Sequence, residues 1–294
     1  MVSVVVVAHD MGRELPRTAF SLGHRHQRGT SPGDVELVVV DNGSAVPVDG
    51  AVLEDAFGGP VRLERIDPAP PSPARAANVG IRLATAPLVG LIVDGARLAS
   101  PGLVDGAVRA ARLADRPVVT APAWHLGPVV HMKAAESGYD QVVEDELLAR
   151  SGWEDDGYAL FSHSTPAASS ARGLFGPMGE SSSLFLTRAL WDELGGLDEG
   201  FELPGGGLVN HDLYRRACEL PGAELVVLLG EGTFHQYHGG AATSRRLTWD
   251  DMHDEYRRVR GIDHVPPPNQ PLFLGRVPRS FLAHVRESAQ RATQ

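Results

Sequence analysis

The sequence predicts an α/β fold in which a Rossmann-like, mostly parallel sheet is flanked by helices and followed by a C-terminal helical tail. In the first half, short runs of Val, Ile and Leu alternate with helix-like stretches, as in sheets covered by helices on both faces. The length of 294 residues suits one such domain with an appended substrate region. Residues 246–294 carry two helical patterns separated by a PPP break, which predicts the tail.

Each element follows from a local pattern. Apolar runs predict strands near residues 2–8, 35–41, 61–66, 88–93 and 117–121, and later at 183–187 and 224–229. Amphipathic spacings predict helices over residues 12–22, 74–84, 102–113, 187–196, 211–220, 249–261 and 279–291. Between the third strand and the second helix, the PAPPSP stretch of residues 68–73 predicts a stiff loop.

The order of these patterns predicts three regions. We expect residues 1–122 and residues 123–245 to be the two halves of the α/β domain, and residues 246–294 to be a helical extension. Within the second region, residues 151–183 are rich in Gly, Ser and Pro, so we expect a mobile loop without packed elements. A substrate-covering lid and a disordered surface insertion are both compatible with this composition.

Composition excludes several classes of function. The formal net charge of −10 opposes binding to nucleic acid or to an acidic membrane surface. The longest apolar runs are too short to span a bilayer, and the N-terminus shows no secretory leader, so we expect a cytoplasmic protein without a transmembrane segment. The single cysteine, Cys218, agrees with a reducing compartment. The sequence leaves open whether the protein forms a homo-oligomer.

Acidic residues follow three of the predicted strands. Asp10, Asp41 and Asp94 each stand at the carboxyl end of an apolar run. In an open parallel sheet, ligands gather at these ends, so the three carboxylates are expected along one rim. Any one of them alone could instead cap the following helix. Three carboxylates at corresponding strand ends favour a binding site.

The sequence around these positions resembles glycosyltransferase family 2, whose nucleotide-binding half has the GT-A fold. The resemblance implies that residues 1–122 are the nucleotide-binding half and residues 123–245 the acceptor-binding half. VSVVVVAHD is similar to the family's opening strand, which implies donor contacts for Ala8, His9 and Asp10. VELVVVDNGS is similar to the second strand and implies that Asp41 contacts the donor base. ARAANVGIRLA resembles a third family stretch and implies a donor-side role for Asn78, although alanine stands where the family usually has arginine.

LIVDGARLASPGLV resembles the strand that carries the family's Asp-x-Asp motif, which binds Mg²⁺ or Mn²⁺ and, through it, the donor diphosphate. This chain has Asp94, Gly95 and Ala96 there, so the second aspartate is missing and metal dependence is left open. His235 and His238 lie in a glycine-flanked loop directly after a buried strand. Neutral imidazoles bind cations, so we expect Asp94, His235 and His238 to form any metal site, with two polar loop histidines as the alternative.

On the acceptor side, LDEGFELPGGGLVNHDLYRRA resembles the segment that carries the family's general base. The resemblance places the base at Asn210, which cannot accept a proton as a base at neutral pH. Asp212, two residues further, is the best remaining candidate for the base, and a helix-terminal cap is its alternative role. The other candidate bases are His211, Glu180 and Glu202.

The resemblance therefore implies an inverting glycosyltransferase that uses a nucleotide-diphosphate sugar and an acceptor hydroxyl of unknown type. A second hypothesis from another class is a catalytically silent protein that binds a nucleotide sugar or a glycan. Ala96 and Asn210, which replace the usual acidic residues, motivate it.

Overall fold

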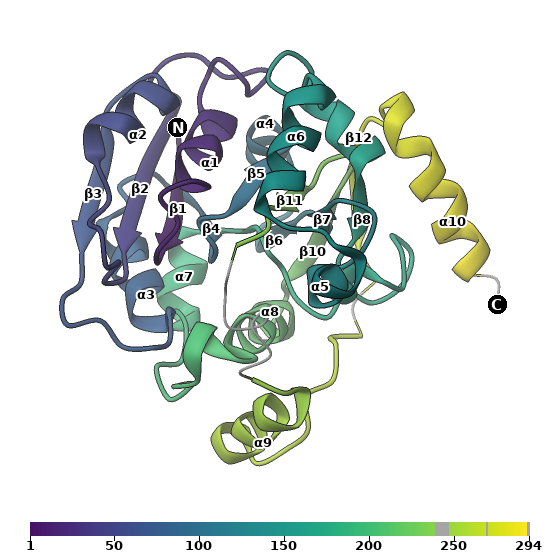
Figure 1. Cartoon of the computed structure of the whole chain (residues 1–294). Helices are drawn as coiled ribbons and strands as arrows, with labels where there is room; N and C mark the ends of the chain where they lie inside the picture. Colours follow the sequence, from purple (N-terminus) through teal and green to yellow (C-terminus); the bar gives the residue numbers. More distant parts are fainter. Residues whose placement is uncertain (239–246, 269, 293–294) are drawn as a thin grey trace.

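The computed structural model of this chain describes residues 1–238, 247–268 and 270–292. Its main sheet has eight strands in the order β12-β10-β6-β9-β4-β1-β2-β3 (Figure 1). The strands are β1 (Val2–Ala8), β2 (Val35–Asp41), β3 (Val61–Arg65), β4 (Leu88–Ile92), β6 (Pro117–Thr120), β9 (Leu184–Thr187), β10 (Glu224–Leu229) and β12 (Leu272–Gly275). All neighbours pair in parallel except β9, which is antiparallel to β4 and β6. The mostly parallel α/β sheet is confirmed.

Helices cover both faces of this sheet. One face carries α1 (Leu15–Leu22), α2 (Gly50–Phe57) and α4 (Leu103–Ala110), and the other carries α3 (Ala74–Leu83), α7 (Arg188–Leu194) and α8 (Val209–Glu219). Side chains of β1 alternate between the two cores: Val4 and Val6 pack on the first, Val5 and Val7 on the second. All seven residues of β1 are buried, because a central strand between two helical layers has no solvent face.

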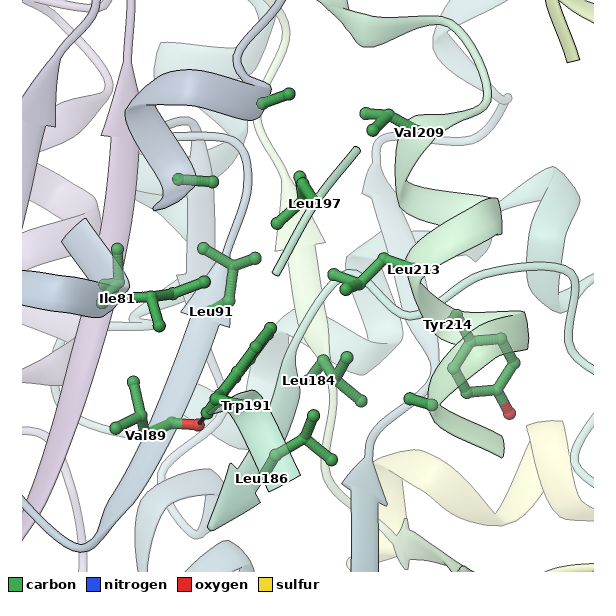
Figure 2. Close-up of a cluster of buried hydrophobic side chains, with 14 of the residues drawn as sticks. Ile81, Val89, Leu91, Leu184, Leu186, Trp191, Leu197, Val209, Leu213 and Tyr214 are labelled. Carbon is green, nitrogen blue, oxygen red and sulfur yellow. Dashed lines mark hydrogen bonds between the residues drawn. The ribbon is translucent and has the colours of Figure 1, made fainter. Parts of the chain in front are cut away.

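Trp191 of α7 lies at the centre of the second core (Figure 2). Its indole Nε1–H donates a 2.9 Å hydrogen bond to the carbonyl of Val89 on β4. Burying the ring removes a large apolar surface from water, and the bond satisfies the one polar atom that the ring carries. The core thereby fixes α7 against the antiparallel part of the sheet.

A second, four-stranded sheet lies beside the first in the order β5-β11-β7-β8. Its strands are β5 (Arg97–Ala99), β7 (Ala123–Leu126), β8 (Ser164–Pro166) and β11 (Thr233–His235). β11 pairs antiparallel with β5 and parallel with β7, so His235 stands between Arg97 and His125. This small sheet positions the histidines of the site described below.

The expectation that residues 151–183 lack packed elements is wrong. The segment begins at the end of α6 (Gln141–Ser151) and contains the 3₁₀ turns η2 (Gly157–His163) and η3 (Ala168–Ser170) as well as β8. Trp153 and Phe161 bury their rings in a third core with Trp124 and Phe234. These apolar side chains are enough to anchor the segment, although Gly, Ser and Pro dominate its composition.

The C-terminal region is more than helical. It contains α9 (Trp249–Arg260), the edge strand β12, a turn η5 (Arg279–Phe281) and α10 (Leu282–Ala292). In Figure 1, α9 lies at the lower edge of the molecule and α10 at the right. Phe281 docks α10 by packing against Trp124 and Phe161. The predicted boundary at residues 245 and 246 lies outside the described residues.

Three short elements complete the chain: η1 (His131–Lys133), α5 (Ala134–Ser137) and η4 (Pro204–Gly206). Among the residues that the structure describes, no helix is both long enough and apolar enough to cross a bilayer.

Candidate functional site

A cleft of about 890 Å³ opens at the carboxyl ends of β1, β2 and β4. The strand ends contribute His9, Asp10, Asn42 and Asp94, and the opposite wall comes from the proline-rich loop, the η4 turn and the start of α8. Such a volume is in the range that holds a cofactor-sized or substrate-sized ligand. The cleft lies where the strand-end rule predicts a ligand site.

Asp94, His235 and His238 come together on the wall of this cleft. His235 Nε2 lies 2.7 Å from Asp94 Oδ2, and His238 Nε2 lies 3.4 Å from the same oxygen. The two Nε2 atoms are 3.1 Å apart. All three side chains are at least three-quarters buried. The sequence-predicted metal-ligand set is therefore one compact cluster in the structure.

Electrostatics within this cluster favour an ionised carboxylate. Burial opposes charge on Asp94, but the adjoining imidazoles of His235 and His238 hold the pKa of this carboxyl well below its usual range. Burial lowers the pKa of His235 to about 4, which keeps that ring neutral at physiological pH. Burial also opposes charge on His238, yet Asp94 raises the pKa of this imidazole.

The turn after β4 explains why Ala96 has no part in the cluster. Ala96 is fully buried in the first core, and its N–H donates to Asp94 Oδ1 at 2.9 Å. Its carbonyl accepts the backbone N–H of Gln236 at 2.7 Å, which holds the β11 loop against the turn. Gly95 is packed against Ala8 and Met11, where a Cβ would come within about 3.1 Å of both. Gly95 and Ala96 thus shape the turn and do not line the cleft.

His9 and Asp10 line the cleft at the end of β1, as does Ala8. His9 Nδ1 lies 2.9 Å from the carbonyl oxygen of Asn42. Asp10 has a positive φ of 53°, and its backbone N–H donates to Ser44 Oγ at 2.9 Å. Aspartate tolerates this left-handed conformation better than most residues, so the turn holds both side chains at the rim.

The structure does not bring Asp41 to the cleft surface. Its side chain is 1% exposed, Oδ1 accepts the N–H of Ser44 at 2.8 Å, and Oδ2 is paired with Arg65. Burial opposes its charge, but the bonds from Ser44 and Arg65 lower the pKa of this carboxyl. Asp41 therefore braces the loop after β2, and the neighbouring Asn42 and Gly43 face the cleft instead.

Asn78 also lies away from the cleft, against the prediction of a donor contact. Its amide nitrogen donates to the carbonyl of Leu197 at 2.9 Å and to Glu199 at 3.0 Å, and its oxygen accepts the N–H of Leu197. These bonds tie α3 to the loop after α7. The residue lines a different surface hollow, together with Arg82 and Arg216.

Asp212 does not reach the cleft either. Two residues along an α-helix rotate by about 200°, so Asp212 and Asn210 point to nearly opposite faces of α8. The Asp212 carboxylate is 1% exposed and accepts hydrogen bonds from Arg216 Nε at 2.7 Å and from both Nε and Nη2 of Arg260. The Asp212 carboxylate thus joins α8 to α9. The helical period of the sequence alone would have predicted that Asp212 faces away from Asn210.

Glu180 lines the cleft beside Asn210. Asn210 Nδ2 donates to Glu180 Oε2 at 2.9 Å and to the carbonyl of Ser181 at 2.7 Å. Burial opposes the charge on Glu180, but the nearby His211 and Arg97 lower the pKa of its carboxyl. His211 lies behind it, with Nδ1 3.6 Å from Oε2, and packs against Trp249. Glu202 is exposed outside the cleft lining.

Two further histidines, which the sequence analysis did not identify as site residues, lie beside the cluster. His125 on β7 and His131 on η1 lie next to His235, with ring centroids 5.2 and 5.1 Å from it. Their positions depend on the pairing of β7 with β11, which has no signal in the local sequence.

Comparison with known proteins supports the fold. No protein-family model matches this chain, and no curated protein matches it. Solved structures of S. aureus TarS do match in three dimensions, at 12% identity. The structure of TarS residues 1–349 in complex with UDP-GlcNAc covers 88% of this chain with a TM-score of 0.55, and the chain spans 65% of its length. A longer TarS structure gives a TM-score of 0.51 over 88% of this chain, which spans 38% of TarS.

Proposed function

We propose that this protein is a glycosyltransferase that moves a sugar from a nucleotide-diphosphate donor to an acceptor hydroxyl, with inversion at the anomeric carbon. The observation that carries the proposal is the cluster of Asp94, His235 and His238 on a cleft at the carboxyl ends of the strands. Ligands bind at this edge in open α/β sheets. The shared fold with TarS, whose structure holds UDP-GlcNAc, and the motifs similar to glycosyltransferase family 2 support a nucleotide-sugar donor.

The shape of the cleft suggests how a donor would lie. The rim formed by His9, Asp10, Asn42 and Gly43 faces the proline-rich loop, which offers a slot for the nucleoside. The diphosphate would then extend towards Asp94, and the sugar towards Glu180 on the far wall. This orientation places the reacting carbon between the groups that would perform the two chemical tasks of such an enzyme, leaving-group stabilisation and proton removal.

The donor-side cluster fits a divalent cation. Asp94, His235 and His238 offer one ligand atom each, and these atoms lie within 4.8 Å of one another. Two imidazole nitrogens and one carboxylate suit Mn²⁺ better than Mg²⁺, which prefers oxygen ligands. A cation held here would neutralise the negative charge that the leaving diphosphate develops.

Glu180 is the proposed general base. It would take the proton of the acceptor hydroxyl as that oxygen bonds to the anomeric carbon and the bond to the diphosphate breaks. Asn210, which stands where the resemblance places a base, would orient Glu180 through its 2.9 Å hydrogen bond. A lowered pKa makes a carboxylate a weaker base, but the attacking hydroxyl becomes acidic as its bond to carbon forms, so a late proton transfer remains favourable.

A panel of nucleotide sugars tests the proposal by release of nucleotide diphosphate in the presence of Mn²⁺. In Glu180→Gln we expect kcat to fall by about 10² or more while donor affinity changes only a few-fold, because a base acts mainly in the transition state. Glu202→Gln is the matched control, since this exposed carboxylate lies outside the cleft, and it should keep native kcat. Native kcat in Glu180→Gln would exclude Glu180 as the base.

The silent binding protein remains the second candidate function. It is favoured by the absence of a carboxylate at Asn210 and by the engagement of Asp212 in a salt bridge on the other side of α8. Calorimetric binding of a nucleotide sugar without any turnover, across donors and simple acceptors, would support this candidate over the enzyme.

A further inference from the structure

His125 and His131 have no part in the proposed transfer reaction, yet they form a cluster with His235. The three ring centroids lie 4.4 to 5.2 Å apart. One nitrogen from each ring lies within 4.8 Å of a nitrogen of both others. The strand pairing fixes this proximity, since His125 and His235 are direct partners in the register of β7 and β11.

Hydrogen bonds orient two of these rings in the way that metal-binding proteins orient histidines. His131 Nε2 lies 3.0 Å from the carbonyl oxygen of Leu126, which can only accept, so Nε2 carries the proton. His235 Nε2 lies 2.7 Å from the carboxylate of Asp94. In both rings the proton on Nε2 leaves the lone pair on Nδ1, as in metal ligands whose other nitrogen donates to a carbonyl or a carboxylate.

These Nδ1 atoms are the second observation that points to a ligand. His131 Nδ1 and His235 Nδ1 are both buried and have no hydrogen-bond partner within the described parts of the chain. Buried polar atoms in native proteins normally have a partner, so two unpaired acceptors in one cluster require an explanation. In the third ring, His125 Nδ1 accepts a hydrogen bond from the backbone N–H of His131 at 3.2 Å, and a metal bound at this nitrogen would replace that bond.

We propose that His125, His131 and His235 form a transition-metal site of the kind that takes Zn²⁺ or Co²⁺, distinct from the Asp94, His235 and His238 set. Imidazole ligands select zinc and similar ions over Mg²⁺ and Ca²⁺. Ligand nitrogens in a tetrahedral zinc site lie about 3.4 Å apart, given zinc–nitrogen bonds of about 2.0–2.1 Å. Small rotations of three side chains that already lie within 4.8 Å would produce this spacing.

The shared ligand makes the two sites alternatives. A neutral imidazole has one lone pair, which His235 can present at Nδ1 to the three-histidine site or at Nε2 to the set with Asp94 and His238. Zinc in the three-histidine site therefore removes His235 from the donor-side cluster. In that state Asp94 acts as the outer partner that orients the His235 ring.

The test removes the alternative site first. In a background variant with Asp94→Asn and His238→Asn, the asparagine can still accept from His235 Nε2, and all three proposed ligands remain. Zn²⁺ is titrated without nucleotide, in competition with a chromophoric chelator. We expect this background to bind one Zn²⁺ per chain, and the further changes His125→Asn and His131→Asn to weaken binding by at least 100-fold. The matched control adds His163→Asn, an exposed histidine elsewhere, and should bind as the background does.

Two results would overturn the proposal: a background variant that binds no Zn²⁺, or binding that survives the loss of His125 and His131. If the four-residue variant fails to fold, zinc-edge X-ray absorption of the background variant decides, since three imidazoles are expected around the metal and one or none contradicts the site. These measurements need neither a sugar donor nor turnover. Their outcome is therefore separate from that of the proposed glycosyl transfer.

Discussion

Asp212 offers the sharpest test of how this fold uses its charged residues, because its role in the structure differs from the one its sequence position implies. Its carboxylate is 1% exposed and is bonded to Arg216 and Arg260, whose side chains are 26% and 24% exposed. Removing one partner of a buried ion pair costs about 3–5 kcal/mol. Here the arginines are partly solvated and keep other acceptors, including Asp198, so we expect Asp212→Asn to lower the free energy of unfolding by roughly 2–3 kcal/mol.

Urea unfolding and thermal melting measure this loss, which corresponds to a fall in Tm of roughly 3–5 °C for a chain of 294 residues. Turnover measured well below the new Tm should stay within about two-fold of native, since the side chain does not line the cleft. Asp198→Asn is the matched control: it removes a more exposed partner of Arg260 and should cost no more than about 1 kcal/mol. A 100-fold loss of kcat at unchanged Tm would refute the structural role and restore Asp212 as a candidate base.

Two further predictions concern packing and pH. Gly80→Ala should lower the free energy of unfolding by about 1–3 kcal/mol, because its Cβ would lie 2.3 Å from Val5 Cγ1; an unchanged urea midpoint would mean that α3 packs further from β1. Burial lowers the pKa of His26 to about 4, so the unfolded chain binds a proton below pH 6.5 that the folded chain does not, and stability falls as pH drops from 6.5 to 4. Between pH 7.5 and 5, the free energy of unfolding of His26→Phe should fall by about 2 kcal/mol less than that of the native chain. An equal fall in both proteins would contradict a lowered pKa for His26.

The main sheet was largely predictable because its central strands are buried on both faces. β1 and β2 are nearly continuous runs of valine and leucine, and their bounds agree with the prediction. The second sheet was not predictable in this way. β5, β7 and β11 are three or four residues long and carry Arg97, His125 and His235, so their pairing depends on tertiary contacts and not on local propensity.

The same distinction separates the site residues that the sequence identified from those it missed. The sequence predicted the set of Asp94, His235 and His238 from the resemblance of the Asp94 strand and from two histidines in a loop after a buried strand, and the structure brings these three side chains together. Asp41 satisfies the same rule, yet its side chain turns towards Arg65 on the neighbouring strand β3. A strand-end position therefore predicts the edge of the sheet where a residue lies, but not the direction of its side chain.

The alanine at position 96, where the resemblance implies a second aspartate, can be understood from the packing around it. Ala96 is fully buried, its N–H holds Asp94 and its carbonyl holds Gln236, so a longer acidic side chain here would have to enter an apolar core. The antiparallel pairing of β5 with β11 brings His235 opposite Arg97, one residue after Ala96. An imidazole from the adjoining strand can thus reach Asp94 without a change in the turn. On this reasoning we expect Ala96→Asp alone to destabilise the chain, and any Mn²⁺ affinity to depend still on His235 and His238. A gain in Mn²⁺ affinity without a loss of stability would contradict this and show that the turn can open to admit the aspartate.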